Sequence, residues 1–208
     1  TGADLTGANL DGVDLKGRDL TGTILNGIDL SGKDLTGTIL KGADLTGANL
    51  DGVDLKGRDL TGAILNGIDL SGKDLTGTIL KGADLTDVIL PSISLSEKNF
   101  QRTVFDGLDL SGKNLSESSL WDASFKNTNL ENTNLGHADF RAVDFTETKN
   151  NSLSGANLQG TSFLLANLSG VNLTDAILNE TYFLQATLTG LDFTDVADVL
   201  INGSMFVE

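Results

Sequence analysis

Residues 1–20 read TGADLTGANLDGVDLKGRDL and repeat a five-residue unit with Leu at its last position. This repeat indicates the fold. From Leu5 to Phe145 every fifth residue is Leu or Phe, and after one slip the series resumes at Leu153 and runs to Phe193. A period of five fits neither the 3.6 residues of a helical turn nor the alternation of an ordinary strand. The chain must therefore turn a corner every five residues, which predicts a solenoid.

Each place in the unit has a predicted role. The Leu or Phe is expected to point inward and stack on its equivalent one coil away, where burial contributes about 1.5 to 3 kcal/mol per side chain. Gly recurs at the corner from Gly2 to Gly82, where a positive φ suits glycine and strains other residues. The Asp or Asn before the Leu is expected to hydrogen-bond the backbone of the turn.

The units TGADL, TGANL, DGVDL and KGRDL resemble the A(D/N)LXX repeats of the pentapeptide-repeat family. The resemblance extends from Ala3 to about Phe193. It implies an all-β fold, the right-handed quadrilateral parallel β-helix, with four pentads in each coil. The 38 pentads of this chain would then form about nine to ten coils. The resemblance is specific for the fold and does not by itself imply a function.

The pentads predict a single solenoid domain over residues 1–193 that contains copied segments. Residues 1–40 and 41–80 are near-identical, and 81–120 is a degenerate third copy in which the order of several units is kept. The two close copies differ only at these pairs: Thr1 and Lys41, Thr23 and Ala63. A duplication of this kind is either natural or engineered, and the sequence leaves both open.

The regular series is interrupted once and ends before the C-terminus. Between Phe145 and Leu153 the spacing is eight residues, so three extra residues are expected to bulge out as a loop at 146–152. After Phe193 the pattern stops, and the apolar residues of 194–208 are available to cap the open end of the core.

Composition limits the class of protein further. With no Cys, disulfides and thiolate metal sites are excluded. No stretch approaches the ~20 apolar residues that a membrane-spanning helix needs. The chain opens at Thr1 in mid-repeat without Met, which suggests a piece of a longer protein. The cytoplasm is the favoured location, and a secreted effector is the alternative.

Six charged residues stand in the slot two places before Leu, where small inward-facing residues are the rule. These residues are Arg18, Lys33, Arg58, Lys73, Lys98 and Lys113. An isolated buried charge costs several kcal/mol. The aliphatic parts of these side chains are therefore expected to line the wall of the coil, while their charged end groups reach outward or pair with nearby Asp. How Arg18, Lys33, Arg58 and Lys73 fit cannot be decided from the sequence.

The sequence predicts no enzyme activity, no catalytic residues and no cofactor site. His137 is the only His and falls at an outward corner, without Cys nearby to complete a zinc site. The glycine spacing follows the pentad and matches no phosphate-binding or hydrolase motif.

One face is predicted to carry an acidic ladder, formed by Asp14, Asp34, Asp54 and Asp74 on successive coils about 4.8 Å apart. Such a ladder would attract divalent cations. The favoured alternative is a set of solvated turn residues, partly balanced by Lys33 and Lys73. No specific metal is predicted.

The formal charge of −15 disfavours binding to nucleic acid or to anionic membranes, and it permits docking on basic surfaces. An acidic solenoid also resembles the pentapeptide-repeat proteins that imitate DNA and occupy the DNA-binding saddle of gyrase. Those relatives dimerise through a C-terminal helix, whereas here only a short tail follows the repeats. A homodimer through the C-terminal end is therefore left open. Charge also keeps a stack of repeats in solution.

A candidate partner or dimer stripe follows one row of corners: Trp121, Arg141, Leu164 and Leu184, with Leu165 and Tyr182 near them. Trp, Tyr and Arg are favoured anchors of protein interfaces. The alternatives are a tail that folds back over these residues, or no contact at all.

The predicted function is a non-catalytic rigid scaffold for a protein partner, which acts as a module of a larger, effector-like bacterial protein. The alternatives are a DNA mimic that binds and inhibits or protects DNA gyrase or topoisomerase, and an engineered or chimeric repeat protein.

Overall fold

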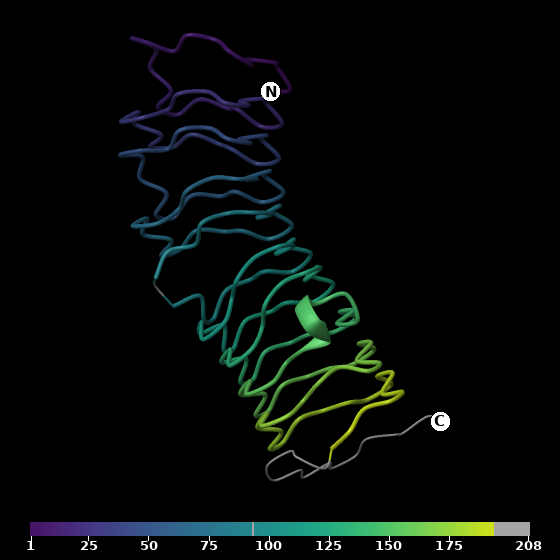
Figure 1. Ribbon diagram of the computed structural model, residues 1–208. Helices are drawn as coiled ribbons and strands as arrows, with labels where there is room; N and C mark the ends of the chain where they lie inside the picture. Colours follow the sequence, from purple (N-terminus) through teal and green to yellow (C-terminus); the bar gives the residue numbers. More distant parts are fainter. Residues whose placement is uncertain (93, 194–208) are drawn as a thin grey trace. The chain divides into compact units, whose positions relative to one another are not determined.

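The computed structural model describes residues 1–92 and 94–193, which fall in two compact units. Unit 1 spans Thr1–Ile93 and unit 2 spans Ser94–Glu208. Within each unit the chain winds through successive stacked coils (Figure 1). The single domain expected over 1–193 stays a prediction, and the expected cap at 194–208 lies outside the described residues.

The coils are joined by isolated parallel bridges rather than by extended strands. In unit 1, Asp4 pairs with Ile24, which pairs with Asp44 one coil further on. Leu25 donates its N–H to the carbonyl of Asp44 at 2.7 Å, and Leu45 donates to Ile64 at 2.8 Å. The paired residues lie twenty positions apart, which is the length of four pentads, and the chain forms a β-helix with parallel bridges.

The corners are tight turns with the predicted chemistry. Ala8 donates its N–H to the carbonyl of Leu5 at 2.9 Å, and Gly7 between them has φ 69°. This is the arrangement of a type II turn, which requires a positive φ at its third residue. The carboxylate of Asp4 accepts the N–H of Thr6 at 2.9 Å, as expected for the residue before Leu. Both predicted roles are confirmed.

The core consists of ladders of identical or similar side chains. In unit 1, Leu25, Leu45 and Leu65 are 0–1% exposed. In unit 2 two ladders are aromatic. Phe105, Phe125 and Phe145 stack with ring centroids 5.1 and 6.2 Å apart. Phe140, Phe163 and Phe183 stack at 5.6 and 5.4 Å. The inward, stacked placement predicted for the fifth residue is confirmed.

The three extra residues of the bulge form the only helix in residues 1–92 and 94–193, the 3-10 helix η1 at Lys149–Asn151. Before η1, Asn114 pairs with Asn134, twenty positions on, whereas Asn134 pairs with Asn157, twenty-three positions on. The insertion is therefore absorbed within one coil, and the ladders resume behind it.

Among the described residues, the structure contains no helix with the length and apolar character needed to span a membrane.

Unit 2 places side chains at many corners, whereas the corners of unit 1 that have a positive φ are glycine except Asp87. The corner residues with positive φ that are not glycine include Glu97, Arg102, Glu117, Asp122, Asn127, Asn132, His137, Ala142, Leu165, Asp175, Glu180 and Gln185. Left-handed backbone costs a non-glycine residue roughly 1–2 kcal/mol. Unit 2 therefore tolerates strain at its corners and gains side chains on its outer surface.

Candidate functional site

The inward-slot lysines of unit 1 are held by backbone carbonyls. Lys33 donates from Nζ to the carbonyl of Leu10 at 2.6 Å. Lys73 donates to the carbonyls of Leu50 at 2.6 Å and Val53 at 3.2 Å. The expectation that these heads escape outward or pair with Asp is wrong for both residues. The ammonium groups reach into the previous coil, where peptide carbonyls offer acceptors.

The carbonyls of Leu10 and Leu50 also accept the turn N–H groups of Val13 and Val53, both at 2.9 Å. Each lysine therefore uses the second lone pair of a turn carbonyl. No parallel bridge joins Asp14, Asp34, Asp54 and Asp74, all of which the structure describes, to one another. Arg18 behaves in a related way, since its Nε donates to the carbonyl of Asp14 at 3.4 Å. Within the described chain, the buried Nε of Arg58 has no hydrogen-bond partner.

The predicted acidic ladder is a row of turn caps. Asp34 and Asp74 accept the N–H groups of Thr36 and Thr76, both at 2.8 Å. The hydrogen bonds of the Thr36 and Thr76 side chains, followed by these backbone hydrogen bonds, lower the pKa of each carboxyl, to about 2 for Asp74.

The cations beside the ladder differ from those expected. Lys16 pairs with Asp34 at 3.5 Å, and Lys56 pairs with Asp74 at 3.3 Å. Lys33 and Lys73, which were expected to balance the ladder in part, donate to carbonyls, and within the described chain no ion pair joins them to these aspartates. Among the residues that the structure describes, no three His, Cys, Asp or Glu side chains converge as metal ligands.

The candidate stripe forms a continuous edge of unit 2, which we call the Trp121–Leu184 edge. It comprises Trp121, Arg141, Leu164, Leu165, Tyr182 and Leu184. Backbone hydrogen bonds join its coils: Asp122 N–H to Arg141 O at 2.9 Å, Ala142 N–H to Leu164 O at 2.9 Å, and Leu165 N–H to Leu184 O at 3.1 Å. Tyr182 pairs with Ser162 and immediately precedes the core residue Phe183.

The apolar side chains of this edge are open to solvent. Leu165 and Tyr182 are both 54% exposed, Leu184 is 48% exposed and Trp121 is 36% exposed. Leu164 is half-buried. Runs of exposed apolar side chains are uncommon on monomers and are typical of contact surfaces.

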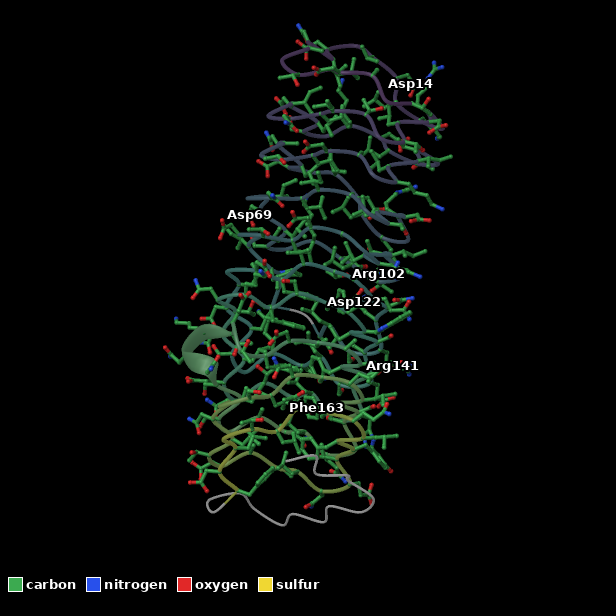
Figure 2. All side chains as sticks on the ribbon, turned by 90° about the vertical axis from the view of Figure 1, so that its right-hand side faces the viewer. Asp14, Asp69, Arg102, Asp122, Arg141 and Phe163 are labelled. Carbon is green, nitrogen blue, oxygen red and sulfur yellow. The ribbon has the colours of Figure 1, made fainter. Side chains whose placement is uncertain are left out.

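Two arginines flank the tryptophan. The guanidinium carbons of Arg102 and Arg141 lie 5.5 and 6.0 Å from the ring centroid of Trp121, within the range of cation–π contact. Arg102 Nε also pairs with Asp122 at 3.4 Å, and Arg141 Nη2 pairs with Asp139 at 3.2 Å. Figure 2 shows Arg102, Asp122 and Arg141 following one another along one side of unit 2.

Sequence reasoning missed Arg102 and Asp122 as members of this surface. The signal was present in the sequence. Both residues occupy the second corner position, which is the second residue after the inward Leu or Phe, in the same row as Leu165. They were overlooked because in most of unit 1 that position is glycine and carries no side chain.

Elsewhere the structure assembles no catalytic combination among the described residues. His137 is exposed at a corner with φ 57°, and its ring covers the corner of Gly160, where an added Cβ would overlap it. A surface cavity of about 320 Å³ is lined by Gly72, Lys73, Asp74, Pro91 and Ser92. It contains no nucleophile paired with a base, and Lys73 is engaged by carbonyls.

Comparison with known proteins supports the repeat architecture. A family model described as pentapeptide repeats matches in eight copies over 1–27, 19–57, 59–90, 109–147, 123–163, 152–175 and 166–197. No curated protein sequence matches the chain.

Several solved structures of repeat proteins are similar. HetL, a pentapeptide repeat protein involved in heterocyst differentiation regulation in the cyanobacterium Nostoc sp. strain PCC 7120, is 32% identical, with a TM-score of 0.52 and 87% of each chain covered. Full-length QnrB1, a plasmid-mediated fluoroquinolone resistance protein, is 20% identical, with a TM-score of 0.39, and the match covers 98% of this chain and 89% of QnrB1. Rfr23 from the cyanobacterium Cyanothece 51142 is 20% identical, with a TM-score of 0.20, and the match covers 92% of this chain and 97% of Rfr23.

Proposed function

This chain belongs to the pentapeptide-repeat family, and on that premise we propose that it is a non-catalytic binding scaffold that presents the Trp121–Leu184 edge to a protein partner. The observation that carries the proposal is the exposure of Trp121, Leu165, Tyr182 and Leu184 along one edge of unit 2. A side chain that is half exposed gains little from folding, so its presence on a repeated edge favours a role in contact.

The family fold is a right-handed β-helix. For this chain we propose the four-sided form, which is supported by bridges that join residues twenty positions, or four pentads, apart. We also propose nine to ten coils over residues 1–193, with 194–208 as a cap. Backbone hydrogen bonds join successive coils within each unit, which favours a rigid scaffold.

A regulatory role that depends on binding is consistent with the similarity to HetL. HetL is 32% identical over 87% of this chain and is involved in the regulation of heterocyst differentiation. Such a role can be filled by binding a protein without any catalysis. A homodimer through the C-terminal end remains part of the proposal as an alternative occupant of the edge.

A second candidate is a DNA mimic that binds gyrase or topoisomerase, and the charge of −15 favours it. The unit 2 edge argues for the scaffold instead, since its exposed apolar side chains and the two arginines beside Trp121 do not imitate a phosphate backbone.

Affinity capture from a bacterial lysate tests the scaffold, with wild type compared against Trp121→Ala and Leu164→Ala. His137→Ala is the matched control, because His137 is an exposed corner residue in a different row. The proposal predicts a protein that wild type and His137→Ala retain and that both edge variants lose. Equal capture by all four proteins would overturn it.

A further inference from the structure

The row of corners along the Trp121–Leu184 edge is unusual within unit 2, because none of its five second-position residues is glycine. These residues are Arg102, Asp122, Ala142, Leu165 and Gln185, and all have positive φ. The other rows of corners in the described part of unit 2 each include glycine, among them Gly107, Gly112 and Gly160. This edge alone keeps a side chain at every corner, in spite of the conformational cost.

Leu165 shows most clearly that folding does not require these side chains. It is a bulky apolar residue at φ 61°, a conformation that disfavours any residue with a Cβ. It is also 54% exposed, so burial offsets little of that cost. Strained residues that persist without a packing role cluster at binding sites, which points to a ligand that covers Leu165.

The backbone of the edge restricts the kind of partner. The N–H groups of Arg102, Asp122, Ala142 and Leu165 all donate to the next coil, at 2.9 to 3.1 Å. An incoming strand would need unpaired backbone groups to extend the sheet, and this edge offers none of these donors. An α-helix satisfies its own backbone internally, so it can bind through side chains alone.

The spacing of the coils suits a helix that runs along the edge. Neighbouring coils repeat every ~4.8 Å, and the pitch of an α-helix is about 5.4 Å. Each turn of the helix therefore meets roughly one coil over the three steps from Trp121 to Leu184. The contact is short, which is typical of a transient interface.

The charged residues of the edge determine which end of a partner helix lies beside Trp121. The two arginines of described unit 2 are Arg102 and Arg141, and both lie at the Trp121 end of the edge. Each contacts its aspartate through one nitrogen, and a guanidinium carries five N–H donors. The other end of the edge, with Leu164, Leu165 and Leu184, carries no charge.

We propose that the Trp121–Leu184 edge binds an amphipathic α-helix of a partner protein. Acidic side chains of the helix contact Arg102 and Arg141, and its apolar stripe covers Leu164, Leu165 and Leu184. The inference rests on the proposed scaffold function and specifies the chemistry of its partner.

A displayed library of Trp-free, eighteen-residue helices tests this inference on the full chain. The apolar stripe is fixed, and the residues flanking each end are varied among Glu, Asp, Lys and Arg. Enrichment of helices that are acidic at one end is expected. A selected helix, made as a synthetic peptide, should then shift the fluorescence of Trp121 saturably, because Trp121 is the only Trp in the chain. Failure to enrich any helix, or enrichment of basic ends, would overturn the inference.

Two glycine variants identify the binding surface. Leu165→Gly is expected to weaken the selected peptide at least tenfold without lowering Tm, because glycine relieves the positive φ. Asp175→Gly gives the same relief in another row, at φ 59°, and should change the affinity less than twofold. Unchanged binding by Leu165→Gly would contradict the assigned surface.

The lysate capture distinguishes this inference from the proposed function. A partner that Trp121→Ala loses and Leu165→Gly still retains would overturn the helix and leave the scaffold standing. If no partner is captured at any face, the scaffold function itself fails.

Discussion

Single side chains in the inward slot show how a repeat core accepts polar groups. Thr38 Oγ1 donates to the carbonyl of Leu15, and Thr78 Oγ1 donates to that of Leu55, both at 2.8 Å. Lys33 and Lys73 reach the same kind of acceptor with longer side chains. A polar residue is therefore tolerated inside when it reaches a carbonyl of the preceding coil.

Thr23 breaks this rule and predicts a stabilising substitution. Its hydroxyl is buried, the residue is 1% exposed, and the hydroxyl finds no partner among the described residues. The near-identical second copy has Ala63 at this place. Thr23→Val keeps the shape and removes the unsatisfied hydroxyl, so the free energy of unfolding should rise by about 1 kcal/mol in chemical denaturation.

Thr38→Val is the matched control for this experiment. It removes a hydroxyl that does donate, to Leu15, and should lower the free energy of unfolding by about 1 kcal/mol. A loss of stability in both variants would show that Thr23 has a hydrogen bond after all.

Lys73 gives a second prediction at this scale. Lys73→Met keeps much of the stem and leaves the carbonyls of Leu50 and Val53 without their ammonium donor. The free energy of unfolding should fall by about 1–3 kcal/mol. Lys73→Thr should recover part of the loss, because Thr78 in the same slot reaches Leu55. Equal stability of Lys73→Met and wild type would mean that water replaces the ammonium without cost.

The turns restrict which residues can stand at the corners. Substitutions to glycine and from glycine at a corner are therefore predicted to have opposite effects on stability. Ala142 has φ 59°, and Gly37, at the second corner position of a different row in unit 1, has φ 70°. Ala142→Gly should raise Tm slightly, and Gly37→Ala should lower the free energy of unfolding by about 1 kcal/mol. Thermal and chemical denaturation check the pair. Stabilisation by Gly37→Ala would refute the account of the corners.

The turn caps also predict how stability depends on pH. The pKa values of Asp34 and Asp74 are lowered from 3.8 by hydrogen bonds in the fold, to about 2 for Asp74. The unfolded chain therefore binds protons first as pH falls. Stability should be fully present above about pH 5 and decline between about pH 4 and pH 2.

A double variant isolates these two carboxylates. Asn forms the same cap, as Asn9 does by accepting the N–H of Asp11 at 2.8 Å. Asp34→Asn with Asp74→Asn should keep the fold at pH 7 and make the decline between pH 4 and pH 2 smaller. The remaining decline comes from other carboxyls of lowered pKa, such as Asp19 and Asp69. An unchanged acid profile would show that other groups cause the decline.

The same elements show what could be predicted from the sequence. The Leu period predicted the inward ladders, and the Gly and Asp positions predicted the turns, because these depend on contacts within one or two pentads. The targets of Lys33 and Lys73 could not be predicted, since Leu10 and Leu50 become their neighbours only when the coils stack. Counting pentads across the bulge placed Trp121 and Leu164 in one row. Arg102 was missed because it stands at the second corner position, whereas only the first corner position was counted.

For the whole molecule, the near-identical copies predict that repeats are removable. Deleting 41–80 removes forty residues, which is two coils of twenty, and joins ends that already match in register. Stability of a solenoid is approximately a sum over neighbouring repeats. The shortened chain should therefore fold, keep the circular dichroism of the parent per residue and unfold cooperatively. An unfolded product would contradict the interchangeability of the coils.

We propose that this protein binds a protein partner as a scaffold and does not imitate DNA. Gyrase supercoiling tests this claim most directly, when the purified protein is titrated into the assay at low and high salt. The account predicts no inhibition at micromolar protein in either salt. Inhibition that weakens as salt rises would contradict it, because that dependence is typical of an acidic surface that occupies the DNA-binding site of gyrase.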